Sequence, residues 1–220
     1  TITAPARQAR AEIAFDAGSF GLRQWRLGAG APISKELDIR ASVVSLDWGG
    51  FRPQSEAQKQ TGHARLGWQT DHDRVVVMVG ALNQPADDPL GLTQAQFSAN
   101  PRQTTPQATQ FDTRKNLHQA QLGAQWRHRF GGNDALADAT VTAYAGEGSV
   151  TQWLAIAAGT QAAPRHGGGV IDFDRSYSGL DARMTWRLGS ASIVAGVAHE
   201  RQQDDRRGYL NYTGAVATPT

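Results

Sequence analysis

The segment Leu117–Phe130 alternates between apolar and polar residues along almost its whole length. From Gln119 the polar set is Gln119, Gln121, Gly123, Gln125, Arg127 and Arg129, and the mostly apolar set is Ala120, Leu122, Ala124, Trp126, His128 and Phe130. Successive side chains of a β-strand point to opposite faces, so a period of two predicts a sheet with one apolar and one polar face. About ten such residues are enough for a tilted strand to cross a membrane.

Similar segments recur, which predicts an all-β fold of about nine strands. Their expected ranges are Ala9–Asp16, Leu22–Ala31, Glu36–Leu46, Gly62–Thr70, Arg74–Asn83, Leu117–Phe130, Leu136–Glu147, Gly179–Leu188 and Ala191–Arg201. The alternation slips at Val43–Val44, which predicts a β-bulge. Arg74–Asn83 is a continuous apolar run, and Leu92–Phe97 is compatible with one turn of helix.

The connections between these strands alternate in length. Turns are expected at Pro32–Lys35, Asp71–Asp73, Gly131–Asp134 and Gly189–Ser190, and Ala17–Gly21 is also short. Long loops are expected near residues 47–61, 84–115 and 148–178, followed by a tail at 202–220. Short turns at one rim and long loops at the other are typical of outer-membrane barrels. We therefore predict that residues 1–220 form a single region, an antiparallel up-and-down meander that is part of a transmembrane β-barrel.

A soluble β-sheet protein that binds a ligand or has a structural role is the alternative, because sandwiches also alternate. Two features favour the barrel. The polar set of each strand carries Arg, Gln and Asp along its full length, as a wet lumen would require. Large aromatic residues also stand near the strand ends, as in an aromatic girdle: Trp25, Trp68, Trp126, Phe130 and Trp186.

Composition and motifs argue against several classes of function. The net charge is +2 without a basic block, so no nucleic-acid partner is expected. Cysteine is absent, which removes disulfides, cysteine-ligated zinc and a cysteine nucleophile. The six histidines show no metal-ligand spacing, and Gly167–Gly169 lacks the Lys-Ser/Thr of a phosphate loop. We expect no catalytic residues, no metal site and no cofactor, and hence no enzyme.

Several stretches resemble TonB-dependent outer-membrane receptors of the siderophore type. Gly18–Gly21 resembles the start of their barrel, and Arg206–Asn211 resembles the start of a later loop. Four further stretches resemble a long extracellular loop of one receptor branch: Asp88–Thr93, Gln96–Phe97, Asn100–Arg102 and Phe111–Lys115. No segment resembles the plug or its TonB box. The resemblance implies the first nine strands or so of a larger, plugged barrel in the outer membrane of a Gram-negative bacterium.

The resemblance also implies a role in taking up a ferric siderophore or similar metal chelate. Its partners would be outer-membrane lipid, the remaining barrel and plug, the chelate, and indirectly the TonB complex. Arginine and aromatic side chains suit an anionic chelate with apolar faces, and binding residues concentrate on loops. Packing of the barrel rim is the alternative role for each. The candidates are Trp48, Phe51, Arg52, Phe97, Arg102, Phe111, Arg114, Trp153 and Arg165.

Overall fold

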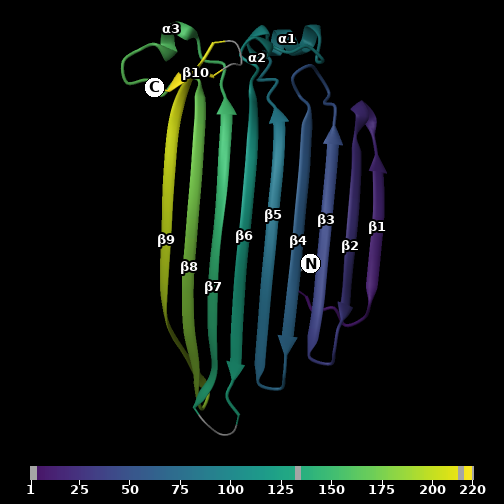
Figure 1. The fold of residues 1–220 in the computed structure, drawn as a ribbon, viewed down its shortest axis with the longest axis vertical. Coiled ribbons are helices and arrows are strands. Elements are labelled where there is room, and N and C mark those ends of the chain that lie inside the picture. The colour runs from purple at the N-terminus through teal and green to yellow at the C-terminus, as the bar shows by residue number, and fades with distance from the viewer. Residues whose placement is uncertain (1–3, 132–134, 213–215, 220) are drawn as a thin grey trace.

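The strands form one antiparallel sheet in which each strand pairs with its neighbours in sequence (Figure 1). The structure is a computed structural model that describes residues 4–131, 135–212 and 216–219. The strands are β1 (Arg10–Ala17), β2 (Arg23–Pro32), β3 (Leu37–Trp48), β4 (Ala57–Gln69), β5 (Asp73–Asp87), β6 (Arg114–Arg129), β7 (Leu136–Trp153), β8 (Val170–Leu188), β9 (Ala191–Asn211) and β10 (Val216–Pro219). β1 and β10 lie at opposite ends of the sheet order, so the sheet is open. The predicted meander is confirmed.

Several strands run further toward the long loops than their alternation indicated. β9 ends at Asn211 rather than Arg201, and β8 begins at Val170 rather than Gly179. Both faces of these extensions carry many polar residues, so the sequence lacks a period-two signal there although the ladder of hydrogen bonds continues. The connections are consequently shorter than expected, at residues 49–56, 88–113 and 154–169. Of the turn expected at Gly131–Asp134, residues 132–134 lie outside the described residues. Residues 1–3, 213–215 and 220 also lie outside them.

The predicted bulge at Val43–Val44 is wrong. β3 keeps continuous register with both neighbours: Val43 pairs with Leu27 and Gly62, and Val44 with Arg26 and Thr61. The two valines therefore lie on opposite faces of a regular strand. The described residues show register shifts in β7, between Leu136 and Asp138, and in β10, between Val216 and Pro219.

Short helices occupy the connections at the long-loop end (Figure 1). The predicted helical turn near Leu92–Phe97 is present as α1 (Gln94–Ala99), where the Thr93 side chain and Gln96 form a capping box. The others are η1 (Ser19–Gly21), α2 (Pro106–Gln110) and α3 (Ala158–Gln161). Among the described residues, no helix is long and apolar enough to cross a membrane.

The register sorts the side chains into two faces. The outer face, as named here, contains the apolar members of each strand, and the inner face contains Gln121, Arg127 and their cross-strand partners. One row of directly paired outer-face residues consists of Ile39, Leu66, Val77, Ala124, Ala143 and Leu180. In the described part of the chain no helix or strand covers this face as a second layer, and Leu122 remains 54% exposed.

Candidate functional site

Three segments that are distant in sequence meet at the long-loop end and form an aromatic–cation cluster. The Phe20 ring of η1 contacts Phe51 edge to face, with their centroids 5.3 Å apart. The guanidinium carbon of Arg102 lies 5.4 Å from the centroid of Phe20 and 5.7 Å from that of Phe51. This geometry is that of a cation–π contact with two rings. We call it the Phe20–Phe51–Arg102 cluster.

Hydrogen bonds to backbone carbonyls hold this cluster in place. The Gly49 amide donates to the Phe20 carbonyl at 2.9 Å, which ties the turn after β1 to the loop after β3. Arg52 donates to the carbonyls of Leu90 and Gln103, which ties that loop to residues 88–113. Arg52 is therefore a loop connector. Within the described residues the guanidinium of Arg102 has no hydrogen-bond or ion-pair partner, so its donors are available to a ligand.

A second cation–π pair lies at the ends of β6 and β7. The guanidinium carbon of Arg114 lies 3.8 Å from the Trp153 ring centroid, and Arg114 also forms an ion pair with Asp112. Arg114 and Trp153 pair in register and lie on the same face as Trp126, which is the outer face, so they point away from the inner face. Beside them, burial raises the pKa of Asp87 above its ordinary value, and the charges of Asp112 and Glu56 add to the effect.

A buried polar lock joins two long loops to β9. The Asn211 amide nitrogen Nδ2 donates to the carbonyl of Phe111 at 3.0 Å, and its backbone amide donates to Oε1 of Gln161 at 2.7 Å. Gln161 Nε2 in turn donates to the Ile156 carbonyl at 2.6 Å. Asn211 is fully buried and Gln161 is 2% exposed, so the hydrogen bonds replace those that water would provide. We call this the Asn211–Gln161 lock.

The structure brings only some of the predicted ligand residues together. Phe51 and Arg102 meet, Arg52 supports them, and Trp48 ends β3 on the inner face. Phe111 is 6% exposed and packs the rim beside the lock, so it offers no surface to a ligand. The remaining four are Phe97, exposed on α1; Arg165, exposed in the loop after α3; and the Arg114–Trp153 pair on the outer face.

Sequence reasoning missed Phe20, Gln161 and Asn211 as site residues. Phe20 lies in a short connection, and only the Gly18–Gly21 resemblance drew attention to it. Its φ of 61° is unusual for a residue with a large side chain and is enforced by the surrounding turn. Gln161 and Asn211 have no local signature, because they bond to each other across 50 residues and Asn211 bonds to Phe111 across 100.

The inner face carries a hollow at mid-height that is lined by both apolar and polar side chains. The hollow has a volume of about 300 Å³ and is lined by Lys59, Thr61, His63, Met78, Leu82 and Gln121, among others. Among the described residues no three His, Asp or Glu side chains are grouped so that they could hold a metal ion. The chemistry available at this face is hydrogen bonding and charge.

Comparisons with known proteins identify the fold. No family model matches the sequence. The ferric citrate transporter FecA in its unliganded form matches with a TM-score of 0.72 and 13% identity, over 99% of this chain and 32% of FecA. BauA, the ferric preacinetobactin receptor from Acinetobacter baumannii, matches with a TM-score of 0.71 and 14% identity, over 99% and 34%. The copper transporter OprC matches with a TM-score of 0.64 and 15% identity, over 93% and 30%.

These matches cover only part of each solved structure and agree in fold. The chain spans about a third of the length of each solved structure it matches. The matched proteins are named as transporters and receptors. The chain has the fold of one part of the β-barrel of TonB-dependent receptors, as the sequence resemblance implied.

Proposed function

We propose that this chain is part of the wall of an outer-membrane TonB-dependent receptor that takes up a metal chelate. The observation that carries the proposal is the uncovered apolar band on the outer face. On β8 this band runs over nine residues, from Leu180 to Leu188 on alternate positions, which matches the length of a membrane-crossing strand. Lipid is the solvent in which such a face is stable without a second layer.

The inclination of the band supports a barrel. Toward the long-loop end, the uninterrupted run of apolar outer-face residues ends at Trp25 on β2 and at Leu180 on β8. The paired row through Leu180 reaches β2 at Ala31, six residues from Trp25. Six residues extend about 20 Å along a strand and six strand spacings about 29 Å across the sheet, so the band crosses the rows at about 35°. Barrel strands tilt by a similar angle to the membrane normal.

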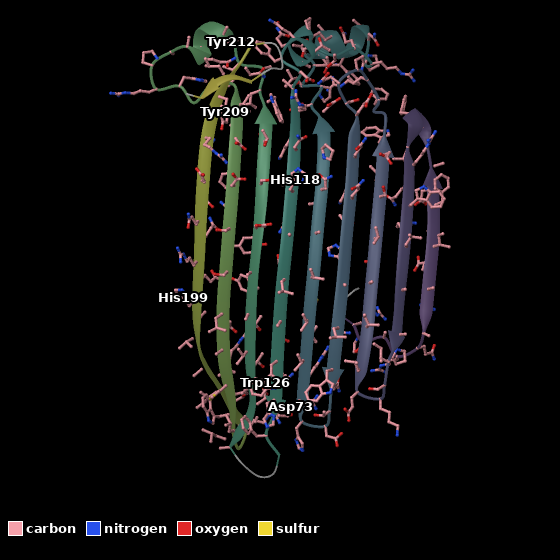
Figure 2. All side chains as sticks on the ribbon, in the orientation of Figure 1. Asp73, His118, Trp126, His199, Tyr209 and Tyr212 are labelled. Atoms are coloured by element: carbon pink, nitrogen blue, oxygen red, sulfur yellow. The ribbon has the colours of Figure 1, made fainter. Side chains whose placement is uncertain are left out.

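Side chains at the short-turn end of the band suit a membrane–water interface. Trp68 and Trp126 lie in one row of paired residues, on either side of Val75. Figure 2 shows Trp126 beside Asp73, whose carboxylate accepts hydrogen bonds from Trp126 Nε1 at 2.9 Å and His128 Nδ1 at 2.8 Å. Aromatic rings with polar tips are enriched at this depth of a membrane.

A soluble sheet is the less favoured alternative. Ile13, Leu122 and Val197 are each at least half exposed in the described structure, and water would make such a large apolar face an aggregation surface. The edge of β1, and the edge of β9 below its pairing with β10, would pair with the remaining strands of the barrel, since unpaired edges are not tolerated in lipid. A plug, and TonB acting on it, would supply transport.

We propose the Phe20–Phe51–Arg102 cluster as a contact for the chelate. Its free guanidinium suits the carboxylate or catecholate oxygens of an anionic ferric chelate, and its rings suit apolar faces. FecA and BauA are named for ferric citrate and ferric preacinetobactin. An iron chelate is therefore the substrate class that we assign, ahead of copper.

Brominated lipids test the membrane placement. Variants that keep a single tryptophan are inserted into vesicles whose acyl chains carry bromine, which quenches tryptophans in contact with lipid. We expect strong quenching of the variant that keeps Trp126 and weak quenching of the matched variant that keeps Trp48 on the inner face. Equal quenching of the two, or a folded and monomeric chain in plain buffer, would refute the proposal.

Titration with ferric citrate tests the chelate contact. The affinity for ferric citrate is measured by quenching of the intrinsic fluorescence. Arg102→Ala should weaken this affinity about five- to tenfold, which corresponds to the loss of one charged contact. Arg165→Ala is the matched control, because Arg165 is also an exposed loop arginine but contacts no aromatic ring in the described part of the chain. Equal loss in both variants would contradict a specific role of Arg102.

A further inference from the structure

The outer face carries a carboxylate at the short-turn end of the apolar band. Between the row through Val77 and the short turns, the described outer-face positions of β4 to β8 hold Asp73 and no other Asp, Glu, Lys or Arg. The arginines at this height, among them Arg74 and Arg127, lie on the inner face. The charge of Asp73 therefore has no lysine or arginine beside it on the face that would meet lipid, where an unpaired charge is costly.

Two neighbouring side chains hold this carboxylate by one of its oxygens (Figure 2). Trp126 Nε1 and His128 Nδ1 both donate to Asp73 Oδ1, at 2.9 and 2.8 Å. A carboxylate only accepts, so His128 donates from Nδ1 and needs no positive charge to make this bond. Within the described residues Asp73 Oδ2 has no hydrogen-bond partner, and the side chain is 27% exposed. The carboxylate thus keeps an open oxygen that can be reached from outside.

Trp68 supplies a hydrogen-bond donor slightly deeper in the band. It pairs in register with Val75, so its row lies two residues, or about 7 Å, further from the short turns than Asp73. Its ring is 37% exposed on the outer face, and its Nε1 has no hydrogen-bond partner within residues 4–131 and 135–212. From the short-turn rim toward the centre of the band, the outer face therefore presents a carboxylate and then an indole N–H.

These two groups stand in the same order as the charges of one class of phospholipid headgroup. In phosphatidylethanolamine the phosphate joins the glycerol that carries the acyl chains, and the primary ammonium lies two carbons further toward the water. A phosphate accepts hydrogen bonds and a primary ammonium donates up to three. The deeper indole N–H of Trp68 therefore suits the phosphate, and the carboxylate of Asp73 at the rim suits the ammonium.

We propose that Asp73 and Trp68 bind the headgroup of a phospholipid with a primary ammonium, of the phosphatidylethanolamine type. The ammonium donates to Asp73 Oδ2 and balances its charge, and the phosphate accepts from Trp68 Nε1. Phosphatidylcholine would lack the first of these bonds, because a quaternary ammonium has no N–H to donate. This inference rests on the proposed function, since it requires the outer face to lie in a membrane.

Binding of defined lipids to the chain folded in detergent micelles tests this inference. Phosphatidylethanolamine and phosphatidylcholine with identical acyl chains are titrated separately, and mass spectrometry of the intact chain counts the bound lipid. We expect phosphatidylethanolamine to bind about five-fold more tightly, since one charge-assisted hydrogen bond separates the two lipids. Asp73→Asn should abolish this preference, because the amide oxygen still accepts from Trp126 but the charge is gone. Asp71→Asn, in the adjacent exposed turn, is the matched control and should keep the preference.

Trp68→Phe separates the phosphate contact from the ammonium contact. It should weaken binding of both lipids about three- to fivefold, whereas Trp25→Phe at the opposite end of the band should change neither affinity. Equal affinities of the parent chain for the two lipids, or an unchanged preference in Asp73→Asn, would overturn the proposal. So would equally tight binding of glycerophosphoethanolamine, the same headgroup without acyl chains, because the site would then be one for soluble amines. Weak quenching of Trp126 by brominated lipid would instead refute the membrane placement.

Discussion

The ring of Tyr144 lies across Gly179, its directly paired neighbour on β8. A Cβ atom added at Gly179 would come within 2.4 Å of Tyr144 Cζ, so the glycine provides the space for the ring. The arrangement is reciprocal, because Tyr177 of β8 lies across Gly146 of β7 at a corresponding 2.5 Å. The Tyr144 hydroxyl donates to Glu200 at 2.7 Å, and the Tyr177 hydroxyl donates to Gln121 at 2.9 Å. Both rings thereby lie along the inner face, each over the glycine of the neighbouring strand.

Replacing the glycine should displace the ring. Gly179→Ala is expected to lower the free energy of unfolding by about 1–3 kcal/mol, as overpacking does. Gly28→Ala is the matched control on the same face, since a Cβ atom there meets nothing within 4 Å. Its effect should be neutral or slightly stabilising, because alanine restricts the unfolded chain. Urea unfolding in detergent micelles measures both, and equal losses would contradict the role of the ring.

Removing the centre of the Asn211–Gln161 lock should loosen the long loops. Asn211→Ala leaves the Phe111 carbonyl without its donor, and should cost about 2–3 kcal/mol of unfolding free energy. Limited proteolysis should then cut within residues 88–113 and 154–169 faster than in the parent chain. Gln58→Ala, an exposed outer-face change on β4, is the control and should alter neither result. Unchanged cleavage in Asn211→Ala would show that the loops are held by other contacts.

Acid should weaken the upper part of β8 and β9 through Asp204. Hydrogen bonds from Arg175 at 2.7 and 2.8 Å lower the pKa of Asp204 below its ordinary value of 3.8. Its contribution to stability is therefore complete above pH 3.8 and is lost as the pH falls through the lowered pKa. Asp204→Asn should reduce stability at neutral pH and flatten the acid limb of an unfolding-against-pH curve. A parallel curve displaced by a constant amount would argue against this linkage.

The contribution of Asp87 to stability should depend on pH in the opposite sense. Burial raises its pKa, so the folded state binds more protons than the unfolded one, and stability falls as the pH rises from 3.8 through the raised value. Asp87→Asn should consequently stabilise the chain at neutral pH and converge with the parent in acid. Thermal unfolding at several pH values measures this, and a constant offset at every pH would refute it. Asp71→Asn, in an exposed turn, is the comparison variant.

The alternation from Gln119 to Phe130 determined much of this fold. A period of two fixes which residues share a face, and turn length fixes which strands are neighbours, since both properties are local. The faces of Leu122, Trp126 and Arg127 follow directly from it. The continuous apolar run of β5 carries no such alternation, and its pairing with β4 and β6 places Val75 and Val77 on the outer face and Val76 on the inner.

Only the tertiary structure decided where the strands end and how the loops use their side chains. β9 extends to Asn211 because β8 continues beside it, although its sequence there no longer alternates. Phe111 is buried and Arg102 contacts Phe20 and Phe51 for the same kind of reason: their surroundings come from loops that fold back from distant parts of the chain. Pairwise contacts over 50 or more residues leave no periodic mark in a single sequence. The sequence could therefore predict which loops form the rim, but not which of their side chains contact one another.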